Sequence, residues 1–290
     1  MKISEAFAGY RKNEILAMNY SPRTYEGYMN AEKRIIGYFG NIEVDAITVD
    51  DVHDLYLNML VDCCSDTARG YLSKLRVVLS YCRRHGEAAL DPEEIKLPRR
   101  EKKTARFLTT NEYTSFLEAI GRAGRGYKNI DRLRNIAITE VLFTTGIRVS
   151  ELCALNRDSI HDRQFVVVGK SKEPRLCFIT KKVESELNVY LSMRTDNSRA
   201  LFVDSSTGNR VRPQSVQRIF RRVSQESGVV CCTPHTMRHS FATYMVEKGV
   251  DIRLVATMLG HQSLQTTQKY THMRDQKLHQ VYEAAMGSAF

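Results

Sequence analysis

Apolar residues in the first hundred positions fall into four stretches that are separated by helix start and stop signals. Ser21 and Pro22 are a typical N-cap and first helical residue, and Thr48 can cap the stretch that follows it. Gly40 and Gly86 each stand directly after a stretch, as is typical of helix ends. The pattern predicts four helices over about 3–18, 22–39, 49–60 and 65–85, enough for a small independent bundle.

The rest of the chain mixes helical stretches with one pair of strands. Two short β-branched and aromatic runs, 164–168 and 176–179, flank a Gly-Lys-Ser-Lys-Glu-Pro turn, and this arrangement predicts a β-hairpin. The predicted helices lie at about 109–120, 131–143, 182–193, 213–226, 234–248, 251–259, 263–270 and 275–285. The predicted fold class is therefore mainly α, with a small β-hairpin or sheet in the second part of the chain.

A proline-bounded, basic segment separates the two parts. Pro92 and Pro98 enclose a short polar stretch, and residues 99–106 then bring a basic run with few apolar side chains. Such a composition is typical of a linker and not of a core element. We therefore expect an N-terminal helical domain over 1–98, a basic linker over 99–106, and a second domain over 107–290.

Charge is distributed unevenly between these parts. Residues 1–98 hold 12 basic and 15 acidic side chains, whereas residues 99–290 hold 31 and 18. The excess of basic residues in the second part favours a polyanionic partner, and nucleic acid is the first candidate.

Other features of the composition exclude several protein classes. No stretch approaches the ~18–20 apolar residues of a membrane helix, and the N-terminus lacks the apolar region of a secretory leader. Seven cysteines include two adjacent pairs and no C-x-x-C, which favours reduced thiols in a cytoplasm over a disulfide framework or a zinc site.

The segment Thr233-Pro-His-Thr-Met-Arg-His-Ser240 is the first candidate for chemistry. His235 and Arg238 fall on one face of the first turns of a helix, where imidazole, guanidinium and free backbone N–H groups can bind an anion. His239 stands four residues after His235, a spacing also found in zinc sites. The glutamate of an H-E-x-x-H motif is missing, since position 236 is threonine, so zinc is the weaker alternative.

Two further segments carry candidate residues. In Thr144-Thr-Gly-Ile-Arg-Val-Ser-Glu-Leu152, an apolar helix ends at Gly146, and Arg148 can then point at a phosphate or pair with Glu151. In the segment 259–272, His261 follows a glycine that ends a helix, and Tyr270 closes the next one. A tyrosine can act as a nucleophile where cations stabilise its phenolate, because its ordinary pKa is near ~10.

Taken together, these segments resemble the tyrosine recombinase (phage integrase) family, and most closely its compact Xer-like type. The pattern Leu-Gly-His-x-x-x-x-Thr-Thr-x-x-Tyr-Thr-His over 259–272 is the most specific part of the resemblance. The resemblance implies a site-specific DNA recombinase that works through a 3′-phosphotyrosine intermediate, with neither metal nor ATP as a cofactor. The implied catalytic residues are Arg148, Lys170, His235, Arg238, His261 and Tyr270.

The resemblance also implies how such a protein engages its partners. A helical core-binding domain and the catalytic domain would form a C-shaped clamp on duplex DNA, with a tetramer on two duplexes linked by exchange of the helix at 275–285. The apolar stripe of that helix can alternatively be buried in its own domain. The candidates for further DNA contacts are Arg69, Lys74, Arg76, Arg99, Arg100, Lys102, Lys103, Lys172, Arg218, Arg221 and Arg222.

Two other functions remain as alternatives at this stage. A type IB topoisomerase shares the cleavage chemistry, and a DNA-binding regulator could use the same fold without catalysis. The intact set of catalytic residues and the compact layout favour the recombinase. Lys172 stands close enough to Lys170 to compete for the role of general acid. The expected location is the cytoplasm, near the nucleoid, and an accessory or paralogous recombinase is a candidate partner.

Overall fold

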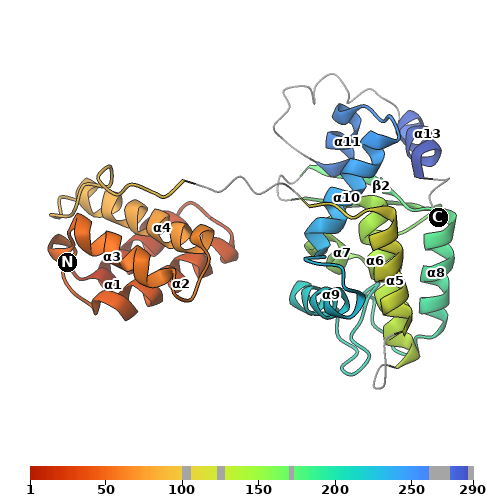
Figure 1. Ribbon diagram of the computed structural model, residues 1–290, viewed down its shortest axis with the longest axis horizontal. Coiled ribbons are helices and arrows are strands. Elements are labelled where there is room, and N and C mark those ends of the chain that lie inside the picture. Colours follow the sequence, from red (N-terminus) through yellow and green to blue (C-terminus); the bar gives the residue numbers. More distant parts are fainter. Residues whose placement is uncertain (100–105, 123–127, 170–172, 261–274, 287–290) are drawn as a thin grey trace. The chain divides into compact units, whose positions relative to one another are not determined.

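A computed structural model describes residues 1–99, 106–122, 128–169, 173–260 and 275–286, with side chains in the last range described from 279 onward. The chain divides into two compact units, Met1–Lys103 and Thr104–Phe290 (Figure 1). The fold class is confirmed: the structure is mainly helical, with a small antiparallel sheet in the second unit. The described residues contain no helix that is long and apolar enough to cross a membrane.

The first unit is helical throughout its regular structure. Its elements are α1 (Ile3–Tyr10), the π-helical η1 (Arg11–Leu16), α2 (Pro22–Phe39), the 3₁₀ turn η2 (Val44–Ala46), α3 (Val49–Met59) and α4 (Ser65–Arg84). The caps are those that the sequence predicts: Ser21 Oγ accepts a hydrogen bond from the backbone N–H of Thr24, and Thr48 and Asp51 form a capping box. The helix predicted over 3–18 begins at Ile3 but ends at Leu16, and its second half, η1, is a π-helix.

The second unit consists of helices around one hairpin. Its elements are α5 (Thr110–Arg122), α6 (Asn129–Thr145), α7 (Val149–Ala154), β1 (Gln164–Val168), β2 (Pro174–Phe178), α8 (Lys181–Ser192), α9 (Pro213–Ser227), α10 (Pro234–Glu247), α11 (Ile252–Leu259) and α13 (Asp275–Met286). The strands pair antiparallel, and Val167 lies opposite Arg175. The helix predicted at 263–270 falls outside the described residues.

Helix α6 is the centre of this unit, and α5, α8 and α10 pack around it (Figure 1). Its residues from 137 to 145 are all buried, as expected of a helix enclosed by others. The polar residues at its end are accommodated because Thr144 Oγ1 and Thr145 Oγ1 donate hydrogen bonds to backbone carbonyls one turn earlier, at 2.7 and 2.6 Å. The helix therefore runs two residues beyond its predicted end and stops at Gly146.

Helix α13 buries its apolar stripe against its own unit. Tyr282, Ala285 and Met286 are at most 4% exposed, and the helix packs on β2. The ring of His279 stacks on Phe178 with centroids 4.9 Å apart. Of the two alternatives that the sequence allowed for this stripe, the single chain adopts the intramolecular one.

A pair of carboxyl groups faces the interior between α6 and α8. Glu140 is 2% exposed and accepts a hydrogen bond of 2.9 Å from Lys182 Nζ. Glu186 is half-buried, and its Oε2 atom is enclosed without a hydrogen-bond partner. Burial and the neighbouring Glu140 carboxylate raise the pKa of Glu186 to about 7, although Lys182 opposes this shift.

This pair predicts a pH-dependent stability. A carboxyl whose pKa is raised on folding binds its proton more tightly in the folded state, so its ionisation destabilises the fold as pH rises through about 7. Glu186→Gln should therefore stabilise the protein at pH 8 by about 1–2 kcal/mol, a value reduced for partial exposure, and have little effect at pH 5. Denaturant unfolding at both pH values measures this. Glu184→Gln, on the same helix, is the control, and equal effects of the two variants would contradict the prediction.

Candidate active site

Arg238 lies at the centre of the site and connects the ends of two helices. Thr233 caps α10 and Pro234 occupies its first position, so Arg238 falls in the second turn, where it is 6% exposed. Its Nη1 donates to the carbonyl of Gly146 at 2.7 Å, and its Nη2 donates to that of Leu259 at 2.6 Å. Burial, together with the nearby guanidinium groups of Arg148 and Arg175, lowers the pKa of Arg238 to about 10. Arg238 is therefore still a cation at neutral pH.

Gly146 is the turn that lets α6 end beside α10 and α11. Its φ is +62°, and a Cβ there would lie 2.5 Å from Phe241 Cδ1 and 2.7 Å from Leu259 Cδ2. Neither the conformation nor the space accepts a side chain. The turn brings Arg148, two residues later, to the N-cap of α7.

A buried carboxylate joins Arg148 to a second arginine. The side chain of Glu151 is 5% exposed, and its Oε1 accepts from Arg148 Nη1 at 2.9 Å. Arg175, on β2, donates to both Glu151 oxygens at 3.1 and 2.6 Å. Burial alone would raise the pKa of Glu151, but Arg175 and Arg148 outweigh it and hold the pKa below its ordinary value. The Arg148 side chain keeps 38% of its surface exposed, so part of its guanidinium can still reach a ligand.

His235 and His239 face each other on α10. Their Nε2 atoms lie 3.0 Å apart, and His235 is exposed. Burial of part of the ring, His239, and the arginines 238 and 148 lower the pKa of His235, which keeps the imidazole neutral at physiological pH. The described residues contain no group of three or more His, Cys, Asp or Glu side chains placed to hold a metal.

The glycines that directly precede two other candidate segments lie beside this cluster. A Cβ on Gly169 would lie 3.2 Å from Arg148 Nη1, and one on Gly260 would lie 3.1 Å from Arg175 Cδ. These glycines immediately precede Lys170 and His261 in the sequence. Lys170, Lys172, His261 and Tyr270 themselves lie outside the described residues.

Sequence reasoning missed one residue of this cluster. Arg175 has no motif that distinguishes it from the many other basic residues of the second part, and only its strand position brings it to Glu151. The sequence predicts Glu151 only as an alternative partner of Arg148. In the structure, Glu151 accepts hydrogen bonds from both Arg148 and Arg175.

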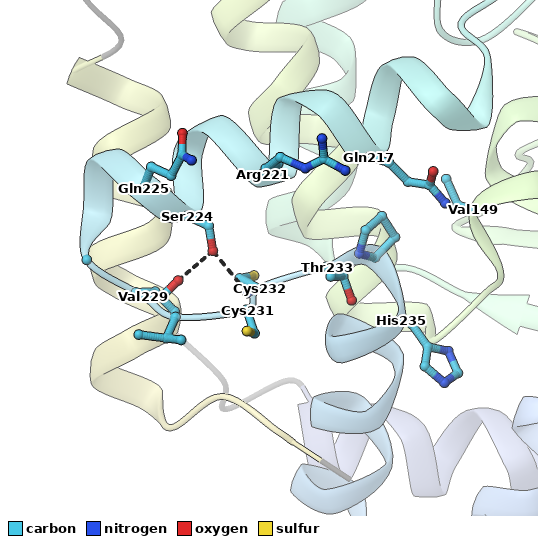
Figure 2. A pocket seen from close by; sticks show the side chains of 13 residues that line it. Val149, Gln217, Arg221, Ser224, Gln225, Val229, Cys231, Cys232, Thr233 and His235 are labelled. Atoms are coloured by element: carbon cyan, nitrogen blue, oxygen red, sulfur yellow. Dashed lines mark hydrogen bonds between the residues drawn. The ribbon is translucent and has the colours of Figure 1, made fainter. Parts of the chain in front are cut away.

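The candidates for further DNA contacts occupy varied environments. On α9, Arg218 and Arg221 are exposed, whereas Arg222 is half-buried and pairs with Glu226 at 3.3 Å. Arg221 and Gln217 line a pocket of about 840 Å³ that also reaches His235, so this face of α9 adjoins the candidate site (Figure 2).

In the first unit, two of the candidates on α4 donate hydrogen bonds to backbone carbonyls. Arg69 Nε donates to the carbonyl of Pro98 at 2.9 Å, and Lys74 Nζ donates to that of Gly70 at 3.2 Å. Burial lowers the pKa of Lys74. Arg76 lines a second, open pocket, and Arg99 is exposed. Arg100, Lys102 and Lys103 lie outside the described residues.

Comparisons with known proteins agree on one family. The model of the phage integrase family matches residues 106–277. The chain is 34% identical to tyrosine recombinase XerC of Alcanivorax borkumensis over 275 residues, which cover 91% of this chain and 88% of the relative. It is also 34% identical to tyrosine recombinase XerD of Oceanobacillus iheyensis over 242 residues, 79% of each chain.

Solved structures show the same fold at lower identity. The Tn1549 transposon integrase in complex with circular intermediate DNA superimposes with a TM-score of 0.74, at 18% identity, over 93% of this chain and 95% of the other.

Proposed function

The chain belongs to the phage integrase family and is a tyrosine site-specific recombinase, and we propose that it cuts and rejoins duplex DNA through a 3′-phosphotyrosine bond on Tyr270. The reaction needs no external energy source, because the phosphotyrosine bond conserves the energy of the phosphodiester that it replaces. Suitable tasks are the resolution of chromosome dimers and the integration, excision or inversion of mobile elements.

One observation carries the proposal: among the described residues of the site, three clustered arginines face one carboxylate. Arg148, Arg175 and Arg238 are close enough to affect one another electrostatically, and Glu151 is the carboxylate among them. This excess of positive charge suits a phosphodiester, whose non-bridging oxygens gain negative charge during attack. Arg148 and Arg238 are the proposed clamp on those oxygens.

The remaining steps are proton transfers and the displacement at phosphorus. The Tyr270 oxygen bonds to phosphorus while the bond to the 5′ oxygen breaks. His235 accepts the phenolic proton, and its lowered pKa supports this because the imidazole is neutral before the step. Lys170 donates a proton to the departing 5′ oxygen, and His261 donates a hydrogen bond to the phosphate. Neither the displacement at phosphorus nor the two proton transfers require a metal ion.

The DNA partner and the assembly complete the proposal. The two domains, 1–98 and 107–290, and the basic linker 99–106 would each contact the DNA of one recombination site. Four protomers would join two sites, with an accessory or paralogous recombinase as a further partner, in the cytoplasm near the nucleoid. In the tetramer, α13 would leave its own unit and bind the same surface of a neighbouring protomer, a domain swap that preserves its contacts.

The first test concerns the nucleophile. Tyr270→Phe removes only a hydroxyl group, so we expect unchanged DNA binding and complete loss of covalent protein–DNA adducts on denaturing gels. Tyr244→Phe, on α10 of the same unit, is the control and should form adducts normally. Adducts formed by the Tyr270 variant would remove Tyr270 from the role. A plasmid relaxed at random sites by the unmodified protein would favour the topoisomerase alternative.

The second test concerns the general acid. Lys170→Ala should slow cleavage by roughly 10²–10⁴-fold, the usual contribution of a positioned acid. A 5′-bridging phosphorothiolate substrate has a leaving group that needs no proton, and it should restore most of this rate. Lys172→Ala is the matched control. Rescue of the Lys172 variant but not of the Lys170 variant would transfer the role to Lys172.

The third test asks whether α13 exchanges between protomers. Arg163 Nη1 donates to Glu283 Oε1 at 2.5 Å, which ties α13 to the unit. Arg163→Glu and Glu283→Arg should each reduce strand exchange, because each places like charges opposite one another. A mixture of the two variants restores opposite charges only between different chains. If α13 exchanges between protomers, the mixture should therefore recover strand exchange of DNA.

The double variant Arg163→Glu/Glu283→Arg is the control for folding and charge, and it should be active in either case. If the double variant is active and the mixture is not, α13 remains on its own unit during the reaction.

A further inference from the structure

Arg175 is a basic residue of the site that the proposed chemistry does not use. It lies on β2, and only 10% of its side chain is exposed. Its guanidinium donates two hydrogen bonds to the Glu151 carboxylate, at 3.1 and 2.6 Å, and its Nε donates one to the carbonyl of Met258 at 3.0 Å. One side chain thus connects the hairpin, the start of α7 and the end of α11.

Two glycines let the backbone pass close to this guanidinium. A Cβ on Gly260 would lie 3.1 Å from Arg175 Cδ and 3.2 Å from its Nη1. A Cβ on Gly169 would lie 3.4 Å from Arg175 Nη1 and 3.4 Å from Glu151 Oε1. The residues that directly precede Lys170 and His261 therefore both lie against Arg175, and Gly169 also lies against Glu151.

The contacts of Arg175 require an arginine. A planar guanidinium can donate two parallel hydrogen bonds to a carboxylate and a third, from Nε, to another acceptor, whereas a lysine ammonium cannot reproduce this geometry. Arg175 also competes with Arg148 for Glu151, since both donate to Oε1.

We propose that Arg175 is a positioning residue, which holds the hairpin that carries Lys170 in register with the phosphate clamp of Arg148 and Arg238. It acts through its hydrogen bonds to Glu151 and to the carbonyl of Met258 near the end of α11. This inference rests on the proposed function, because it assigns Arg175 to the alignment of the general acid. A lost alignment of about 1 Å is sufficient to reduce a rate by about 10²-fold.

The test uses single-turnover cleavage of a nicked DNA substrate by the full-length protein. Arg175→Lys keeps the charge and loses the fork, and Arg175→Met loses both. We expect Arg175→Lys to cleave about 10²-fold more slowly than the unmodified protein, at a temperature at which both are folded, and to bind DNA with similar affinity. The 5′-bridging phosphorothiolate substrate should recover most of that loss, because its leaving group makes the position of the acid unimportant.

The control is Arg199→Met, which removes an exposed arginine that pairs with Asp158 in the same unit. It should cleave both substrates at the normal rate. If Arg175→Met proves too unstable to assay, Arg175→Lys alone decides the matter.

Two results would overturn the proposal. A normal cleavage rate in Arg175→Lys would show that the fork is not needed for alignment. An equal loss on both substrates would show that Arg175 acts on another step than protonation of the leaving group. If the unmodified protein forms no covalent adduct at all, the proposed function fails first, and that outcome is distinguishable from either of these.

Discussion

The buried carboxylate of Glu151 is the constraint on which the second unit depends. A carboxylate with 5% exposure is stable as an anion only where cations and hydrogen-bond donors surround it. Here the donors are the backbone N–H and side chain of Arg148, from the start of α7, and the side chain of Arg175, from β2. The helix and the hairpin must therefore be in place together, and a disturbance of either leaves a charge without compensation.

The arginines of the site also donate hydrogen bonds at the helix ends around it. Both α6 and α11 end in a glycine with positive φ, which leaves carbonyl groups at their last turns without partners inside the helix. Arg238 and Arg175 donate to carbonyls at these ends, and cations are favourable at the negative end of a helix dipole. Arg238, one of the two arginines of the proposed phosphate clamp, thus also stabilises the ends of α6 and α11. This explains how like charges can be assembled in advance.

The first unit and α13 illustrate how the remaining surfaces differ from this site. In the first unit, the candidate basic residues Arg69 and Lys74 donate hydrogen bonds to backbone carbonyls. The number of basic residues alone therefore does not show how many of their donors face a ligand. Helix α13 buries Tyr282 and Met286 as core residues of its own unit. Within the described residues, α13 contacts its unit mainly through β2 and Arg163.

The sequence by itself predicted most of the described helices and the hairpin, and it supplied the candidate residues of the site. Local signals are sufficient for Ser21, Thr48 and Thr233 to start helices, because capping depends on neighbours within three residues. The pattern around Arg148, His235 and Arg238 was enough to predict an anion site. Only the tertiary structure decided that Glu151 is shared by two arginines, that Arg175 belongs to the site, and that α13 packs on its own unit. These contacts join residues far apart in the chain, and their energies depend on burial, which no local pattern specifies.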